Sequence, residues 1–449
     1  MKTTVARWRA LLVSAGLSAL FLIVYGGCNW IAAHRAHVSS FYFEWERHIP
    51  FVPLLIPAYM SLDLFFVGAP FLCLTGRELR AYSFRIVTAI LVAGVCFLVF
   101  PLKFGFDRPS ASGVLGFVFD WFREFDAPYN LVPSLHAALL LLVGEIYVRR
   151  LRGFPRYAAI AWFVLIGLSP VLTYQHHVID IATGFGLAAY CFYLFPERNY
   201  DSLGERDIRL GFYYAVGALV VCAAALLLGG WSFFLLWPAG ALAIVAGGYW
   251  WFGPSIYRKT DGTLPWSTRF VLAPCLLGQE LSRIFYRRQC RPWDLITPQV
   301  WIGSRLGRAD AEKARRAGVT AVLDLTAEFS EAAEFREIAY GNIPVLDLTA
   351  PTEQQLHRMS EFITEHSRDG IVYVHCKIGY SRSAAAIGAW LLASGKARSI
   401  EEVFLIIYRA RPSIIIRGEV VNAFRKFVST LRRNEDGAFV LASAARAPA

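Results

Sequence analysis

Eight apolar runs in the first 252 residues of this 449-residue chain constrain its fold more than any other feature. A helix that crosses the roughly 30 Å hydrocarbon core of a bilayer needs about 20 apolar residues, and each run is close to that length or longer. The runs cover residues 11–33, 51–74, 86–102, 131–148, 158–174, 178–195, 210–228 and 231–252. The whole chain has 56% apolar and only 18% charged residues, a composition that argues against a wholly soluble protein. Together with the eight runs, it predicts a multi-span α-helical membrane domain over residues 1–252.

The net charge of +11 indicates either a nucleic-acid partner or a membrane topology. From Asp294 onward there are 20 basic and 18 acidic residues, against 25 and 16 before it, so most of the excess lies in the apolar part. With a cytoplasmic N-terminus, thirteen basic residues fall in inner loops and five in outer loops. This asymmetry favours positive-inside topology over nucleic-acid binding. We expect an integral membrane protein, such as one of a bacterial inner membrane, whose N-terminus and C-terminal domain are both cytoplasmic.

The eight cysteines show no CxxC pair and no regular spacing, and most lie in apolar runs. This distribution argues against a disulfide scaffold and against a zinc site. We therefore expect no metal and no cofactor.

The pattern changes after Phe252. Residues 253–292 are Arg-rich and amphipathic after Pro274, which favours an interfacial linker, with a flexible tether as the alternative. Residues 293–433 alternate short β-rich runs with amphipathic helices and predict a compact cytoplasmic α/β domain. The expected strands are 300–303, 321–325 and 371–375, and the expected helices are 309–317, 353–366, 383–393 and 400–409. The Ala-rich tail, 434–449, is expected to be disordered.

The strongest motif in the chain runs from His375 to Ser383, between an expected buried strand and a helix. Five residues separate Cys376 from Arg382, which lets the backbone curl so that successive N–H groups surround a phosphate at a helix N-terminus. Arg382 can hold two phosphate oxygens and lower the pKa of Cys376, whose thiolate attacks phosphorus, while Ser383 donates to the departing sulfur. The expected phosphate-binding loop consists of Lys377, Ile378, Gly379, Tyr380 and Ser381.

A general acid is also required, and Asp347 is the candidate because it follows a strand in a loop. Residues 294 to about 431 resemble the dual-specificity branch of the cysteine-dependent phosphatases. Within that branch, the segments Asp347–Thr352 and His375–Lys377 are similar to the mitochondrial phosphatidylglycerophosphate phosphatases. Tyr380 departs from that pattern, since such lipid phosphatases often carry Arg there.

Three further elements fall on the outer side of the expected topology: Lys103 to Pro109, Pro133 to His136, and His176 to Asp180. Basic side chains and a serine hydroxyl can clamp a phosphate, and a histidine oriented by a carboxylate four residues later can attack phosphorus. We expect Lys103, Arg108 and Ser134 to bind phosphate, His176 to be the nucleophile, Asp180 to orient it and His136 to protonate the leaving group.

These elements resemble the type 2 phosphatidic acid phosphatase superfamily over roughly residues 51–195, which implies a six-helix core. Leu135 replaces the usual Gly before the first histidine, and Pro170 stands where an Arg is expected. Leu135 and the His176–His177 pair look closer to the inositol phosphorylceramide and sphingomyelin synthase branch, whose members transfer a phospho-headgroup to a lipid alcohol.

The sequence therefore predicts a bifunctional membrane phosphatase, with a phosphocysteine site inside and a phosphohistidine site outside, whose partners are membrane lipids or lipid phosphates. Two alternatives stay open. In the first, the outer site transfers a phospho-headgroup to a lipid alcohol instead of hydrolysing the phosphoester. In the second, the helices only anchor a phosphatase that acts on phosphoproteins.

Overall fold

The computed structural model describes residues 5–110, 113–125, 129–200, 204–433 and 439–440, and it divides into two compact units at residues 199 and 200. The expected tail, 434–449, lies outside the described residues except for residues 439–440. Each unit is described by itself.

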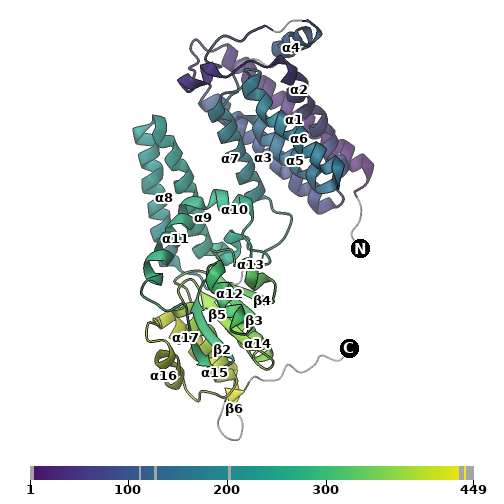
Figure 1. Ribbon diagram of the computed structural model, residues 1–449. Coiled ribbons are helices and arrows are strands. Elements are labelled where there is room, and N and C mark those ends of the chain that lie inside the picture. The colour runs from purple at the N-terminus through teal and green to yellow at the C-terminus, as the bar shows by residue number, and fades with distance from the viewer. Residues whose placement is uncertain (1–4, 111–112, 126–128, 201–203, 434–438, 441–449) are drawn as a thin grey trace. The chain divides into compact units, whose positions relative to one another are not determined.

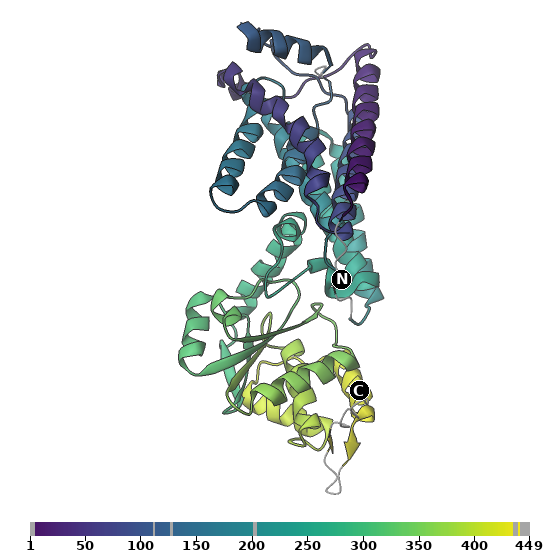
Figure 2. The same ribbon diagram turned by 90° about the vertical axis from the view of Figure 1, so that its right-hand side faces the viewer.

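The first unit is a bundle of α-helices (Figure 1, Figure 2). Its helices are α1 (Arg7–Ala33), α2 (Ile56–Gly68), α3 (Gly76–Val99), α4 (Gly113–Phe125), α5 (Leu135–Arg150), α6 (Phe154–Leu172) and α7 (Val178–Leu194). Helix α4, which was not expected from the sequence, lies across one end of the bundle. A core of buried apolar side chains from α1, α2, α3, α5, α6 and α7 holds the other six together.

The second unit begins with two apolar helices, α8 (Ile208–Leu228) and α9 (Leu236–Gly247), followed by α10 (Trp266–Val271) and α11 (Ala273–Arg287). Its strands are β1 (Trp293–Thr297), β2 (Val300–Ser304), β3 (Val319–Thr326), β4 (Ala339–Val345) and β5 (Ile371–Cys376), with a separate pair, β6 (Arg432–Arg433) and β7 (Phe439–Val440). Its remaining helices are α12 (Arg308–Arg316), α13 (Ala333–Arg336), α14 (Glu353–His366), α15 (Ser381–Ala393), α16 (Ile400–Ala410) and α17 (Gly418–Thr430).

Among the described residues, six helical segments are long and apolar enough to cross a membrane. They are 7–33, 53–72, 76–99, 154–172, 208–228 and 230–257, and they coincide with six of the eight expected spans. The other two expected spans correspond to α5 and α7, which are shorter, at 16 and 17 residues.

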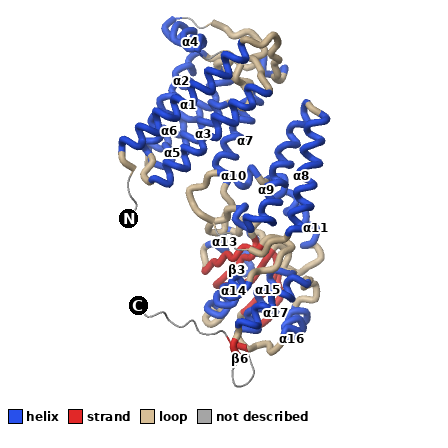
Figure 3. The backbone as a smooth tube through the Cα atoms, turned by 180° about the vertical axis from the view of Figure 1, so that it is seen from behind, coloured by secondary structure: helices blue, strands red, loops and turns tan. Residues whose placement is uncertain are grey.

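The five-stranded sheet of the second unit has the order β1-β2-β5-β3-β4, and only the β1–β2 pair is antiparallel. Side chains alternate across it, as the two-residue period of a strand requires. On β5, Val372 and Val374 face a core formed with α14 to α17, whereas Tyr373 faces the smaller core beneath α12 and α13. The sheet is thus the middle of three layers (Figure 3). The expected strands and helices of this domain are all present, and β4 is the strand expected before Asp347. The edge strand β1 and the helices α13 and α17 were not expected.

Candidate functional site

The loop from Cys376 to Ser381 joins the end of β5 to the start of α15. Gly379 has a positive φ of 83°, and a Cβ at this position would lie 2.5 Å from the Gly303 carbonyl oxygen, so only glycine fits. The Gly379 N–H donates to the Cys376 Sγ over 3.3 Å. The loop therefore curls around the thiol in the way that the motif predicts.

Arg411, which the sequence analysis missed, holds this loop through its backbone carbonyl oxygens. Its fully buried guanidinium donates to the carbonyl oxygens of Gly379 and Ile378, each over 3.0 Å, and pairs with Asp294 at 2.7 Å. These bonds turn the two loop carbonyls toward Arg411, while the Gly379 N–H points to the Cys376 sulfur. The Arg411–Asp294 pair joins residues 117 positions apart, and no local pattern signals it.

Arg382 and Asp347 meet at this loop, as the sequence predicts. The Arg382 guanidinium donates to the Asp347 carboxylate over 3.1 Å, and it makes a two-pronged pair with Glu328 at 2.7 and 3.1 Å. Sequence reasoning missed Glu328. Its place directly after β3 is the available signal, because parallel strands β3 and β5 bring their carboxyl ends to the same edge of the sheet.

Lys377 bridges the loop to α11. Its ammonium group donates to the Gln279 side-chain oxygen over 2.6 Å and to the second Asp347 carboxylate oxygen over 3.2 Å. Asp347 is thus held between Lys377 and Arg382. Ser383 is fully buried beneath the loop.

The electrostatics favour a reactive thiolate. Burial by itself raises the pKa of the Cys376 thiol, but the Arg382 guanidinium, the Ser383 hydroxyl and the loop N–H groups lower it by more, so the net pKa lies below its ordinary value. Cys275, on α11, has the opposite environment, where burial raises its pKa to about 11. A lowered thiol pKa next to a fixed guanidinium is typical of a cysteine nucleophile.

We expect iodoacetamide to alkylate Cys376 at neutral pH while it spares Cys275. The thiolate is the reacting form, so the rate at Cys376 stays high at neutral pH and falls only as the pH drops through the lowered pKa. Ser383→Ala removes one of the groups that lower this pKa and moves the fall to higher pH. Peptide mass spectrometry measures both rates, and equal labelling of the two cysteines at pH 7 would contradict the assignment.

A buried network lies behind β5. The His375 Nε2 is 2.6 Å from a Glu331 carboxylate oxygen, and the Asp324 carboxylate accepts a hydrogen bond from the Lys259 ammonium. Burial by itself lowers the pKa of His375, but Glu331 and Asp324 raise it by more. His375, Glu331 and Asp324 are residue types that bind metal ions in proteins. The Lys259 ammonium, however, already supplies a positive charge beside the Asp324 carboxylate. The network fixes the strand that carries Cys376.

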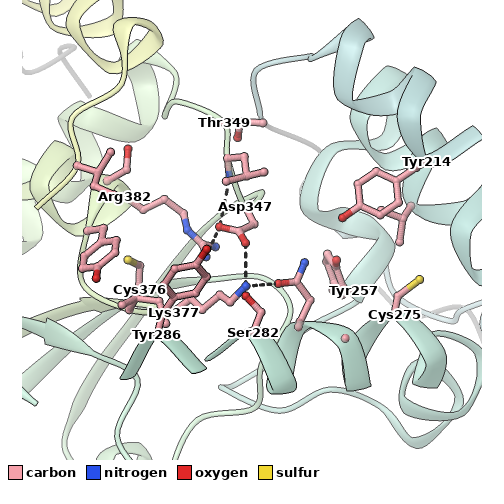
Figure 4. Close-up of a pocket in the computed structure, with 18 of the residues that line it drawn as sticks. Tyr214, Tyr257, Cys275, Ser282, Tyr286, Asp347, Thr349, Cys376, Lys377 and Arg382 are labelled. Carbon is pink, nitrogen blue, oxygen red and sulfur yellow. Dashed lines mark hydrogen bonds and ion pairs between the residues drawn. The ribbon is translucent and has the colours of Figure 1, made fainter. Parts of the chain in front are cut away.

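A cavity of about 740 Å³ within the second unit opens at this loop. Figure 4 shows Cys376 and Arg382 on one side and Tyr214, Tyr257 and Cys275 on the other. The loop side is polar and charged. The far side is formed by α8, α9, α11 and the turn that follows α9, through side chains that include Tyr214, Pro238, Leu242, Val245, Tyr257 and Pro274.

The expected phosphate-binding residues of the loop are placed around this cavity. Four of these five residues, Lys377, Ile378, Tyr380 and Ser381, line it together with Arg382 and Asp347, whereas Gly379 is not among the lining residues. Tyr380 also contacts the linker, because its hydroxyl lies 2.9 Å from the Cys290 sulfur.

The elements of the expected outer site meet in the first unit. The His176 Nδ1 lies 3.4 Å from an Asp180 carboxylate oxygen, and the Ser134 backbone N–H donates to the Asp180 carbonyl over 3.0 Å. The Ser134 hydroxyl oxygen caps α5 by accepting from the Ala137 N–H. His136, in the first turn of α5, stacks on Tyr59 with ring centroids 4.5 Å apart. The starts of α5 and α7 are therefore joined at these residues.

His177, to which the sequence analysis gave no role, connects the loop from Lys103 to Pro109 to the start of α7. Its Nδ1 lies 3.1 Å from a buried Glu46 carboxylate oxygen, and its Nε2 accepts from the Gly105 N–H over 3.1 Å. Its ring also stacks on Phe104 at 4.2 Å. Gly105 lies between Lys103, which is exposed, and Arg108, whose guanidinium lies over the Phe104 ring.

Comparison with known proteins bears on the second unit. Residues 300–428 match the family model described as dual specificity phosphatase, catalytic domain. The chain is 33% identical over 122 residues to "Dual specificity protein phosphatase 19" of Mus musculus, which covers 27% of this chain and 54% of that protein. It is 36% identical over 104 residues to "Phosphatidylglycerophosphatase and protein-tyrosine phosphatase 1" of Homo sapiens, covering 22% and 51%.

A third relative is "Phosphatidylglycerophosphate phosphatase PTPMT2" of Arabidopsis thaliana, 27% identical over 173 residues, which cover 36% of this chain and 75% of that protein. The chain spans about half the length of the first two relatives. The family match includes the strand, loop and helix that carry Cys376 and Arg382. The C-terminal part of the chain therefore contains a dual-specificity phosphatase catalytic domain, the domain of a phosphoric monoester hydrolase.

Proposed function

We propose that this protein is a membrane-embedded phosphatase that hydrolyses lipid phosphomonoesters at Cys376. The observation that carries the proposal is the cavity, because it joins the Cys376 loop to apolar side chains of α8 and α9, two helices in segments long and apolar enough to cross a bilayer. A lipid phosphate has the same two parts, a charged headgroup and an apolar chain. In this proposal the catalytic domain and the N-terminus lie on the cytoplasmic side, as in a bacterial inner membrane.

The chemistry proceeds in two steps. The Cys376 thiolate attacks phosphorus, the S–P bond forms as the ester P–O bond breaks, and Asp347 gives its proton to the departing alkoxide. Water then attacks the phosphocysteine, and the Asp347 carboxylate takes its proton, which releases inorganic phosphate and the free thiolate. Arg382 and the loop N–H groups hold the phosphate oxygens in both steps.

Asp347 must be protonated before the first step. In the free protein, burial by itself raises its pKa, but Arg382 and Lys377 lower it by more, so the carboxyl is ionised. An incoming phosphate dianion competes with Asp347 for Arg382 and adds negative charge beside the carboxylate. Both changes raise the pKa of Asp347, so substrate binding itself promotes the acid form.

The names of two relatives refer to phosphatidylglycerophosphate, which supports a lipid substrate. Another relative is a dual specificity protein phosphatase by name, which supports the alternative of an anchored enzyme that acts on phosphotyrosine or phosphoserine. The apolar far side of the cavity favours the lipid.

A panel of substrates distinguishes a lipid phosphatase from an anchored protein phosphatase. We expect the purified full chain in nanodiscs to prefer phosphatidic acid or phosphatidylglycerophosphate over glycerol 3-phosphate by at least about 10²-fold in kcat/KM, since burial of four methylenes stabilises by roughly 3 kcal/mol. Leu242→Asn, in the apolar wall, should reduce this preference. A phosphopeptide hydrolysed faster than every lipid would refute the proposal.

A second candidate function belongs to the histidines of the first unit. The observation that favours it is the joining of α5 and α7 through Ser134 and Asp180, with Asp180 beside His176. We propose that His176 attacks a lipid phosphate or phosphodiester, that His136 protonates the leaving group, and that Lys103 and Arg108 bind the phosphate. Water or a lipid alcohol then resolves the phosphohistidine, so the site is a type 2 phosphatidic acid phosphatase-like hydrolase or a headgroup transferase.

This second site is tested in a Cys376→Ser background, which removes the other activity. His136→Ala should lower the remaining phosphate release or transfer from lipids by about 10²-fold, the usual contribution of a general acid. His48→Ala, an exposed histidine of the same unit, is the control. Adding diacylglycerol or ceramide distinguishes transfer from hydrolysis. Equal activity in both variants would remove this candidate.

A further inference from the structure

Helix α11 forms one wall of the catalytic cavity. Six of its residues line the cavity: Pro274 and Gly278, and a set of four formed by Cys275, Gln279, Ser282 and Tyr286. The spacing of four, three and four positions within this set places its members on one face of the helix. Lys377 fixes this face against the Cys376 loop through its hydrogen bond to Gln279.

The opposite face of α11 is apolar and exposed. Leu277, Leu281 and Phe285 are 61%, 59% and 60% exposed, and Ile284 is exposed beside them. At about 100° per residue, Leu277 and Ile284 lie across the helix from that set of four residues, while Leu281 and Phe285 lie on the side between the two faces. Soluble surfaces rarely present such a continuous apolar stripe, so it marks a contact with something apolar.

The third side of α11 is polar and sets the rotation of the helix. Arg283 donates to Glu280 over 2.9 Å, and Arg287 pairs with Asp310 of α12. The Arg287–Asp310 pair and the Gln279–Lys377 bond tie α11 to α12 and to the Cys376 loop, and so oppose rotation of its apolar stripe inward. Arg288, which follows the helix, is exposed and adds positive charge at this end.

The apolar stripe continues toward a candidate membrane span. The Trp237 indole N–H, on α9, donates to the carbonyl oxygens of Phe270 and Val271 on α10. The Trp237 ring also stacks on Phe270 at 5.1 Å. Helix α10 leads directly into α11, so exposed aromatic and aliphatic side chains run from the apolar helix to the cavity wall.

We propose that α11 lies in the interface of the bilayer, with its stripe of Leu277, Leu281, Ile284 and Phe285 inserted among the lipids and its opposite face forming the wall along which a lipid enters the catalytic cavity. The occupant of the stripe is the lipid surface, because the stripe is continuous with a candidate span and ends in arginine, the pattern of an interfacial helix on an anionic leaflet. As an account of substrate entry, the inference rests on the proposed lipid phosphatase function.

Photolabelling tests the position of α11 without reference to activity. The full chain is placed in nanodiscs that contain a phospholipid with a diazirine in its acyl chain, and peptides are mapped after irradiation. We expect adducts on the peptide with Leu277 to Phe285, and none on the peptide with Leu405, which is 57% exposed on α16 and does not line the cavity. Labelling of α9 with none on α11 would overturn the proposal.

Kinetics test the entry path. Leu281→Glu should lower kcat/KM for a nanodisc lipid phosphate about tenfold relative to kcat/KM for soluble p-nitrophenyl phosphate, and Phe285→Glu should do the same. Leu405→Glu, the matched control, should leave this ratio unchanged. An unchanged ratio in both α11 variants would overturn the entry path. If the wild-type protein hydrolyses only phosphopeptides, the proposed function fails, while the labelling result still decides the position of α11.

Discussion

In a His136→Ala background, which removes the second candidate activity, Cys376→Ser is expected to lower phosphate release from lipid phosphomonoesters by at least about 10⁴-fold, because a serine hydroxyl at this position is neutral and a far weaker nucleophile than a thiolate. The change keeps the volume of the buried side chain nearly constant, so the loop and the Arg382 pairs should remain. Inorganic phosphate release in nanodiscs measures the loss, and wild-type binding of the substrate by the variant shows that the site is intact.

Cys222→Ser is the matched control for this variant, since Cys222 lies on α8 and does not line the cavity. It should retain full activity. A trapped phosphoenzyme that disappears in Cys376→Ser would identify the intermediate directly. If Cys376→Ser in the His136→Ala background retained the lipid phosphatase activity, the cysteine mechanism would be wrong.

Asp347→Asn is expected to lower kcat for alkyl phosphomonoesters by about 10³-fold, within the usual range for a general acid. An amide cannot give a proton to the departing alkoxide. For p-nitrophenyl phosphate the loss should stay below about tenfold, because nitrophenolate leaves without protonation. Steady-state kinetics on the two ester classes measure the difference.

The pH profile gives a second readout of the same variant. In the wild-type protein, kcat for alkyl esters falls as the pH rises through the pKa of Asp347 in the substrate complex, because the acid form is lost. Asp347→Asn should lack this fall. Asp369→Asn changes an exposed aspartate in the same domain and is the control. Equal losses on alkyl and aryl esters would mean that Asp347 only positions Arg382.

The catalytic loop was predictable because its geometry is local. Cys376 to Ser383 are contiguous between a strand and a helix, so spacing alone places the thiol, the loop N–H groups and the guanidinium around one phosphate. The long helices were predictable for a similar reason, since length and apolarity are properties of a segment. Helix α5 was predicted least well, because its expected run begins at residue 131 whereas the helix begins at Leu135 and ends at Arg150, two residues after the run.

Contacts between distant positions were not predictable. Glu328 is 54 positions from its partner Arg382, and Arg411 is 117 positions from Asp294. The local sequence around a charged side chain does not indicate its distant partner. Only the packing of the strands and helices brings these pairs together. The same holds for Glu46 and His177 in the first unit, which are 131 positions apart.

The sequence alone indicated a dual-specificity phosphatase domain at the C-terminal end, the chemistry that we propose for Cys376, Arg382 and Asp347, and the presence of long apolar helices. Tertiary structure alone decided that α8, α9 and α11 form the apolar side of the same cavity. The physical reason is that chemistry resides in residue types at short spacing, whereas the shape of a cavity depends on which surfaces pack against one another.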